Sequence, residues 1–380
     1  MPERIITNAQ IVLPDEVING TVCVDGGTIK DVSSSPSASP AALDFGGDFL
    51  IPGLVELHTD NLERHVMPRP KSYWPVDAAV LNHDRELCAA GITTVFDAVA
   101  VGYAETGTRK SDLIAAMADS ISRLAGSQSL KADHFIHWRC EIACEDIMSH
   151  IGPVIDNSRT AMVSVMDHTP GQRQFASLDA YYTYYKSKYG YSDAEMEDFI
   201  VRRRREHELY AAGNRKTVVR LAHDRGLAIA SHDDATEAHV EEAIEDGIVV
   251  AEFPTTVEAA RASHNAGLAV LMGAPNVVRG QSHSGNVSAR DLAALGLLDI
   301  LSSDYVPFSL LYGATLLART CDSISLPQAI AKVTRNPARQ VGLDDRGEIA
   351  TGKRADLVRF RMDEDLPAIV EVWRGGDRIA

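Results

Sequence analysis

The chain has 380 residues, 45% of them hydrophobic and 24% charged, and a formal net charge of −16. This length suits one large domain with an attachment or two domains, and the composition is ordinary for a soluble globular protein. The negative charge argues against non-specific nucleic-acid binding, and no apolar run is long enough for a membrane helix, so we expect neither a nucleic-acid nor a membrane partner.

The N-terminus and the cysteines bear on the compartment. No basic segment followed by an apolar stretch opens the chain, so no signal peptide is expected. The five cysteines are sparse and form no CxxC pair, which fits reduced thiols rather than a disulfide framework. We therefore expect a cytoplasmic protein.

Both ends of the chain have sequence patterns typical of short β-strands. Residues 1–50 contain alternating runs rich in β-branched residues, separated by turn signals. Residues 347–361 and 368–379 repeat this pattern with Gly-rich turns. The sequence therefore predicts a small β-sandwich domain built from residues 1–50 together with residues 345–380.

The remaining segment, residues 51–344, alternates between short apolar runs and amphipathic helical stretches. Eight such α/β units are typical of a (β/α)8 barrel of the TIM type. A doubly wound open sheet is the alternative, which the pattern alone does not exclude. The strand candidates, the first of which begins just before this segment, are 49–60, 93–100, 134–142, 161–168, 227–232, 248–253, 268–274 and 298–304.

Potential metal ligands gather where these strands end, which is where such barrels carry their catalytic groups. His58 and Asp60 are two residues apart on an extended segment, so both side chains share one face. A single histidine at a strand end is more often a hydrogen-bonding residue, but an ordered set favours a metal centre for Zn, Mn or Fe. The predicted ligands are His58, Asp60, Glu141, His168, His232 and Asp304.

A strand ending in PGLVELHTD (52–60), between a split β domain and an eight-stranded barrel, resembles the amidohydrolase superfamily. Residues 335–358 are similar to that superfamily's return into its β domain. Its pattern is an HxH or similar pair on strand 1, Lys or Glu on strand 4, His on strands 5 and 6, and Asp on strand 8. Carried over residue by residue, the resemblance implies the same six ligands, with Asp60 and Glu141 departing from the usual His and carboxylated Lys.

Five segments narrow the resemblance to the superfamily's phosphonate-metabolism branch, which serves the carbon–phosphorus lyase pathway. The resemblance implies a diphosphatase reaction, in which α-D-ribose 1-methylphosphonate 5-triphosphate is hydrolysed to the 5-phosphate and pyrophosphate. It also implies a phosphorylated ribose as the small-molecule partner. The segments are 58–70, 81–98, 166–175, 230–236 and 272–286.

The predicted mechanism uses two divalent metal ions, Zn²⁺ first and Mn²⁺ or Fe²⁺ as alternatives, to activate water. Glu141 bridges the ions, Asp304 is the general base, and His83, on a predicted helix, is either an assisting or a structural residue. Arginine side chains suit a triphosphate, because each guanidinium group can donate two hydrogen bonds to one phosphate. At each position the alternative is a side chain that is solvated or hydrogen-bonded within its loop. The predicted substrate contacts are Arg64, His65, Arg173, Gln174, Arg279, Ser282 and His283.

Two other functions stay open at this point. An amidohydrolase acting on a cyclic amide, an amine or an N-acetyl sugar would use the same ligands. A non-catalytic metal-binding component of a phosphonate-processing complex would also carry them. Residues 177–213 form a long tyrosine- and arginine-rich insertion, either a lid or a subunit contact; we expect a homo-oligomer, a dimer.

Overall fold

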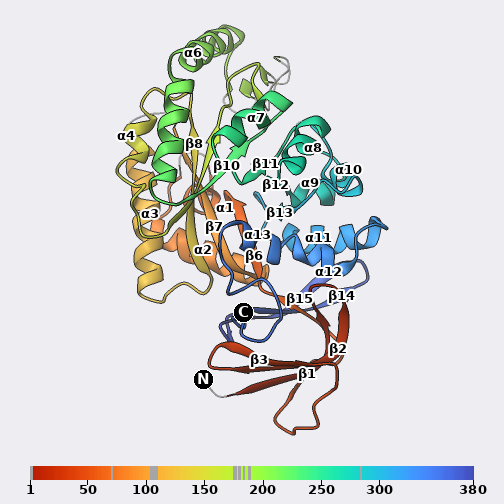
Figure 1. Ribbon diagram of the computed structural model, residues 1–380. Coiled ribbons are helices and arrows are strands. Elements are labelled where there is room, and N and C mark those ends of the chain that lie inside the picture. Colours follow the sequence, from red (N-terminus) through yellow and green to blue (C-terminus); the bar gives the residue numbers. More distant parts are fainter. Residues whose placement is uncertain are drawn as a thin grey trace.

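The computed structural model describes residues 3–69, 72–102, 110–173, 178, 181–182, 185–186, 190–282 and 285–380. A parallel barrel surrounded by helices lies beside a second sheet that contains both chain ends (Figure 1). The predicted (β/α)8 barrel is therefore confirmed.

Eight parallel strands form the barrel, and each overlaps one of the eight predicted runs. Neighbours in the sheet follow the chain order throughout, which excludes the doubly wound alternative, because the strand order of that fold reverses. The strands are β6 (Leu54–Thr59), β7 (Ile92–Val101), β8 (Asp133–Glu141), β9 (Thr160–Met166), β10 (Ala228–His232), β11 (Val250–Glu252), β12 (Ala269–Gly273) and β13 (Ile300–Ser302).

The first and last strands meet through backbone and side-chain contacts. Thr59 and Asp304 form a parallel bridge, and the Thr59 hydroxyl donates to the Asp304 carbonyl at 2.8 Å. The buried Glu56 carboxyl accepts hydrogen bonds from the backbone N–H groups of His58 (2.7 Å) and Ser303 (2.5 Å). The ends of β6 and β13, which both carry predicted ligands, are therefore neighbours.

The inward face of β8 changes from apolar to charged toward its carboxyl end. Ile136, Trp138 and Cys140 belong to the core between the barrel and its helices. Because side chains alternate along a strand, the intervening residues face the barrel interior. These inward residues are Phe135, His137, Arg139 and Glu141.

Helices cover the outside of the barrel (Figure 1), and several start at polar caps. Thr236 and Thr256 each accept a hydrogen bond from a backbone N–H in the first turn of the helix that follows. No helix in the described ranges is long and apolar enough to cross a lipid bilayer. The helices are α1 (Asn61–Val66), α2 (Val76–Ala89), α3 (Lys110–Gly126), α4 (Ile147–Ile151), α6 (Asp193–His223), α7 (Glu237–Glu245), α8 (Val257–Asn265), α9 (Ala274–Arg279), α10 (Ala289–Ala294), α11 (Ser309–Thr320), α12 (Leu326–Ala331) and α13 (Arg335–Gln340).

Helix α6 contains much of the insertion noted in the sequence, and it starts with a capping box between Ser192 and Glu195. It packs against loops at the carboxyl ends of the strands. Asn214 donates to the carbonyl groups of Ile142 and Cys144 at 2.9 and 2.8 Å. The helix therefore forms one wall beside the barrel mouth, while its predicted role as a lid or a subunit contact stays a prediction.

The second sheet combines strands from both ends of the chain. Its order is β16-β15-β14-β5-β1-β2-β3, with β4 paired to β1. The predicted domain boundaries, near residues 50 and 345, stay a prediction; this sheet's strands reach Pro52 and resume at Leu357. The strands are β1 (Arg4–Val12), β2 (Val17–Asp25), β3 (Thr28–Ser33), β4 (Leu43–Asp44), β5 (Phe49–Pro52), β14 (Leu357–Asp363), β15 (Leu366–Arg374) and β16 (Asp377–Arg378).

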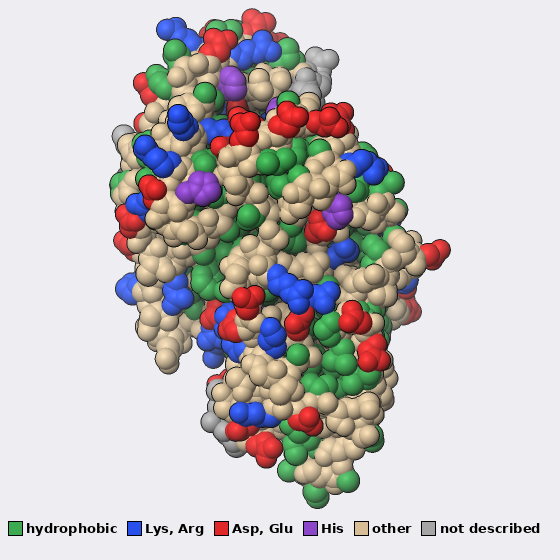
Figure 2. Space-filling model, in the orientation of Figure 1, with side chains coloured by type: hydrophobic (Ala, Val, Ile, Leu, Met, Phe, Trp, Pro, Cys, Tyr) green, Lys and Arg blue, Asp and Glu red, His purple; other side chains and the backbone are tan. Residues whose placement is uncertain are grey.

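The surface seen in Figure 2 mixes basic and acidic side chains and shows no single broad basic area on this face. All five cysteines are free thiols, as expected from their sparse spacing. Burial raises the pKa of the Cys88 thiol to about 12, so this sulfur is protonated at neutral pH.

Asp133, the first residue of β8, ties the barrel to the C-terminal part of the chain. Its carboxylate accepts hydrogen bonds from Arg346 (2.8 Å), Arg354 (2.5 Å) and Arg374 (2.7 Å). These guanidinium groups hold the pKa of Asp133 below its ordinary value, although its burial acts in the opposite direction. Arg346 and Arg354 also pair with carboxylates close to them in the chain, so Arg374 depends most on Asp133.

Replacing Asp133 by Asn should lower the free energy of unfolding by about 3 kcal/mol, because it removes a carboxylate that three partly buried guanidinium groups share. Urea unfolding measures this change. Asp365→Asn is the matched control: Asp365 pairs with Arg319 at the surface, so its loss should change stability by about 0.5 kcal/mol or less. Equal effects of the two substitutions would contradict a stabilising role of Asp133 between the barrel and the C-terminal part of the chain.

Candidate active site

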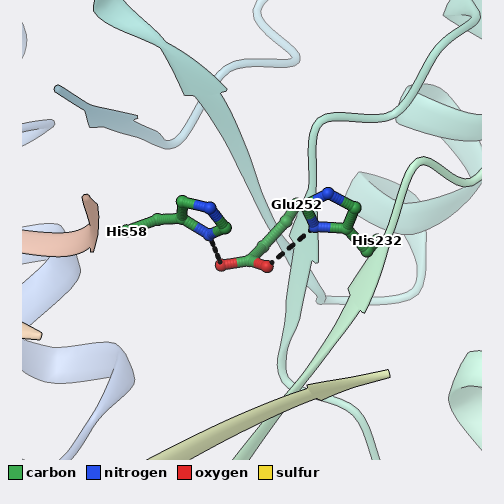
Figure 3. Close-up of side chains that lie close together, drawn as sticks. All are labelled: His58, His232 and Glu252. Carbon is green, nitrogen blue, oxygen red and sulfur yellow. Dashed lines mark hydrogen bonds and ion pairs between the residues drawn. The ribbon is translucent and has the colours of Figure 1, made fainter. Parts of the chain in front are cut away.

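Two histidines at the barrel mouth share one buried carboxylate (Figure 3). Glu252 Oε1 lies 2.9 Å from His58 Nδ1, and its Oε2 lies 3.2 Å from His232 Nδ1. Burial opposes ionisation of Glu252, but the facing imidazoles of His58 and His137 hold its pKa well below the ordinary value. An ionised carboxylate only accepts, so both Nδ1 atoms donate, and each Nε2 keeps its lone pair for another ligand.

His168 has the same arrangement with a different carboxylate. Its Nδ1 lies 2.6 Å from Glu141 Oε2, and its backbone N–H donates to Glu141 Oε1 at 3.0 Å. Arg203 of α6 reaches the same Oε1 at 3.3 Å. Burial alone would lower the pKa of His168, but the carboxylates of Glu141 and Asp233 raise it to about 10. Glu141 therefore fixes the orientation of the imidazole ring through its Nδ1 atom.

Asp233 faces the Nε2 atoms of both histidines. Its Oδ2 lies 3.5 Å from His232 Nε2 and 3.6 Å from His168 Nε2. This oxygen is buried and has no hydrogen-bond partner in the described part of the chain. In a tetrahedral site with bonds of about 2.1 Å, ligand atoms stand roughly 3.4 Å apart. The three atoms therefore fit around one divalent cation.

Asp60 and Asp304 form a second acidic pair at the junction of β6 and β13. Asp60 lies beyond β6, at the N-cap of α1. Its position therefore does not follow from the strand alternation that was predicted to put it on the same face as His58. Burial and then the Asp60 charge raise the pKa of Asp304 to about 6. Asp60 Oδ1 is buried and accepts no hydrogen bond from the described residues. Two adjacent carboxylates with spare lone pairs suit a cation.

Three residues that follow barrel strands have left-handed backbone conformations. The φ angles are 57° at Asp233, 53° at Phe253 and 55° at Asp304. Non-glycine residues adopt this region rarely, at a cost of about 1–3 kcal/mol each, and often do so at functional sites. At Asp233 and Asp304 this backbone holds two of the carboxylates described above.

The strand count corrects the pattern carried over from the superfamily. Glu141, His168 and His232 follow the third, fourth and fifth barrel strands, whereas the pattern puts such residues on strands 4, 5 and 6. The sixth strand, β11, ends in Glu252 instead. The difference arises because β8 is the third strand in the observed order.

His83 lies on the outer side of the barrel wall rather than in its mouth. It projects from α2, and its Nε2 is 2.8 Å from Asp97 Oδ1. Asp97 also accepts from His134, at 2.8 Å, and His134 contacts Asp84 at 3.2 Å. Of the two predicted roles of His83, this position supports the structural one, because the wall of β7 and β8 separates it from the inward-facing residues.

The same cluster gives stability a pH dependence. Burial lowers the pKa of His134, but Asp97 and Asp84 outweigh it and raise the pKa to about 9. The protonated imidazole therefore stabilises the fold fully below pH 6.5, and this contribution is lost as the pH rises through 9. Urea unfolding between pH 6.5 and 9.5 should show a loss of about 3 kcal/mol that is absent from His134→Gln. Parallel curves for the two proteins would contradict this expectation.

Three of the predicted substrate contacts already have protein partners. Arg173 forms ion pairs with Asp234 and with Glu242, the latter at 2.8 Å. Arg64 donates to the carbonyl of Tyr305 at 2.7 Å. His65 Nε2 lies 2.7 Å from a carboxylate oxygen of Glu86. These contacts account for the three side chains without a ligand.

The other predicted contacts belong to two loops. Arg279 is exposed at the end of α9, and Ser282 is half-buried after it. Gln174 and His283 lie outside the described residues. Phosphate binding by this set stays a prediction.

A family model described as the amidohydrolase family matches residues 49–379, which run from β5 to the last residues of the chain. The chain belongs to the amidohydrolase family. This amidohydrolase is 45% identical, over 376 residues, to the alpha-D-ribose 1-methylphosphonate 5-triphosphate diphosphatase of Escherichia coli strain K12. The alignment covers 99% of the chain and 100% of that protein.

Solved amidohydrolase structures share the fold at low identity. The 5-methylcytosine deaminase of Klebsiella pneumoniae has a TM-score of 0.68 at 16% identity, covering 99% of this chain and 98% of that one. The N-acetylglucosamine-6-phosphate deacetylase of Pasteurella multocida has a TM-score of 0.65 at 12% identity, covering all of both chains. At such identities the likeness supports the barrel and the second sheet, not the substrate.

Two residues of this amidohydrolase site were missed in the sequence. Asp233 directly follows His232, and an acidic residue beside a strand-end histidine was a usable signal. Glu252 ends the run IVVAE, and a carboxylate in an otherwise apolar barrel strand was a second signal. Both residues are nearly fully buried, at 4% and 0% exposure.

Proposed function

We propose that this chain hydrolyses α-D-ribose 1-methylphosphonate 5-triphosphate to the 5-phosphate and pyrophosphate. The observation that carries the proposal is the 45% identity, over the full length of both chains, to the diphosphatase of that substrate. The side chains at the barrel mouth support it, since three histidines and five carboxylates suit metal-dependent hydrolysis.

We propose that two divalent cations bind here. His168 Nε2, His232 Nε2 and Asp233 Oδ2 would hold one, because these atoms converge at 3.5–3.6 Å around a buried carboxylate oxygen. His58, Asp60 and Asp304 would hold the other at the junction of β6 and β13. Zn²⁺ fits the imidazole and carboxylate donors, as do Mn²⁺ and Fe²⁺.

Glu141 and Glu252 have a different part in this proposal from the bridging role predicted for Glu141. Each accepts a hydrogen bond from histidine Nδ1 atoms, which fixes the ring orientation and makes Nε2 more basic. Glu252 does so for two rings at once, so it couples the two proposed halves of the site.

Bound divalent cations would polarise phosphoryl oxygens and lower the pKa of water. The residues of the chain then orient the reactants. Asp304, whose pKa is raised to about 6, is suited to accept the proton of the attacking water near neutral pH. The carboxylates that accept from Nδ1 hold the imidazole rings in place, so that Nε2 of each ring is the atom directed toward a cation.

Phosphorus NMR of the purified chain with the 5-triphosphate substrate tests the function. The expected result is loss of the three triphosphate signals and growth of the 5-phosphate and pyrophosphate signals. Pyrophosphate release by the chain alone would exclude a purely structural role in a complex. Turnover of a cyclic imide or an N-acetyl sugar, without turnover of the triphosphate, would overturn the proposal.

A cytoplasmic location and a homodimer complete the proposal. The free thiols and the absence of a membrane-spanning helix among the described residues agree with that location. The dimer rests on the expectation from residues 177–213, and size-exclusion chromatography with light scattering tests it.

A further inference from the structure

Arg139 is a cation in the middle of the acidic site. It lies on β8, two residues before Glu141, with its side chain toward the barrel interior. Its Nη1 lies 3.9 Å from Asp60 Oδ2, and only 16% of the side chain is exposed. A guanidinium group among proposed metal ligands needs a physical reason, because bound cations would repel it.

The donors of this guanidinium are not used by the protein. Nε is buried without a hydrogen-bond partner, and the guanidinium group donates no hydrogen bond to any described residue. The 3.9 Å separation from Asp60 is too long for a hydrogen bond. A buried donor without an acceptor costs about 1–3 kcal/mol or more, so such a group in a native site usually serves a ligand.

The surrounding charges indicate what that ligand is. Burial lowers the pKa of Arg139, but Asp60, Glu63, Glu252 and Asp304 raise it above its ordinary value. These carboxylates balance the guanidinium only while their own charge is not shared with cations. Once divalent ions occupy the site, the balance requires an anion beside Arg139, and a phosphoryl group supplies both the charge and the acceptor oxygens.

Other arginines that sequence reasoning favoured for the triphosphate differ from Arg139. Arg173 already pairs with Asp234 and Glu242, and Arg64 donates to a backbone carbonyl. Arg139, in contrast, faces a proposed metal ligand, since its Nη1 lies 3.9 Å from Asp60 Oδ2.

We propose that Arg139 binds the phosphoryl group at which the triphosphate is cleaved, through hydrogen bonds from its guanidinium to the non-bridging oxygens. This inference rests on the proposed diphosphatase function. In the step, water forms one new P–O bond, the bridge between the α- and β-phosphorus atoms breaks, and pyrophosphate leaves with the bridging oxygen. The proton of water goes to Asp304, while Arg139 keeps its protons and stabilises the charge on the phosphoryl oxygens.

The test compares Arg139→Ala and Arg139→Lys with the metal-loaded wild type. Both variants should lower kcat/KM for pyrophosphate release by about 10²–10³-fold, because Lys lacks the fork and Ala lacks the charge. Metal content, measured by mass spectrometry, should stay at the wild-type level. Added guanidinium ion should restore the Arg139→Ala activity at least tenfold. Arg225→Ala, which removes a surface arginine paired with Asp156, is the control and should behave as wild type.

Binding of inorganic tripolyphosphate separates this inference from the function itself. The wild type should bind it, and Arg139→Ala should bind it at least tenfold more weakly by calorimetry. If the wild type fails to cleave the ribose triphosphate, the proposed function is wrong while this binding difference still tests Arg139. Activity of Arg139→Ala within threefold of wild type, equal tripolyphosphate binding, or loss of metal together with activity would each overturn the inference.

Discussion

Asp304→Asn should lower kcat for pyrophosphate release by about 10³-fold, because the amide cannot accept the proton of the attacking water. The substitution should not strain the backbone, because Asn tolerates the left-handed conformation that Asp304 adopts at φ 55°. A continuous pyrophosphate assay at saturating metal measures the effect.

The control for this experiment is Asp322→Asn, which changes an exposed aspartate in the loop after α11. It should leave kcat within twofold of wild type. Metal content of Asp304→Asn separates loss of the base from loss of a ligand. Full activity of Asp304→Asn would remove Asp304 from the mechanism.

Asp233→Asn should have the largest effect on metal binding. Its Oδ2 is the atom that joins His168 and His232 into a three-donor set, and an amide oxygen without charge binds a divalent cation far more weakly. We expect the affinity of this variant for Zn²⁺ or Mn²⁺ to fall by more than about 10²-fold. Glu252→Gln removes no metal ligand but weakens the hydrogen bonds that orient two histidines, so it should lower the affinity about 10–100-fold.

Titration calorimetry with each metal alone, and metal analysis after dialysis, give these affinities without reference to activity. Asn fits the backbone of Asp233 at φ 57°, so misfolding is not expected. Wild-type metal stoichiometry and affinity in Asp233→Asn would contradict its place in the site, and an effect of Glu252→Gln larger than that of Asp233→Asn would reverse the two roles.

The barrel was predictable because its signals are local. Each strand appears as a short apolar run, and period-two alternation on β8 separates the outward core from inward Arg139 and Glu141. Strand ends are equally local, which is why His58, His168 and His232 were found at the mouth.

The partners of these residues come from distant segments of the chain. Local sequence patterns do not reveal which distant segments lie side by side. Glu252 meets His58 across 194 residues, and Arg173 meets Asp234 across 61. The ligand role predicted for Glu141 followed from its place at a strand end and from the resemblance, and neither reveals that Glu141 contacts His168 at Nδ1. The role of His83 stayed open in the sequence for the same reason, since helix periodicity does not reveal which part of the barrel wall a helix covers.

The left-handed residues after the barrel strands restrict how this site can change during evolution. Only glycine, asparagine, aspartate and a few others hold a backbone with φ near +55° at low cost. Random substitution at Asp233 or Asp304 therefore loses the local chain path as well as the carboxylate, and β-branched residues are excluded. New substrate specificities are more accessible through the loops around the mouth, where a mutation leaves these two positions intact.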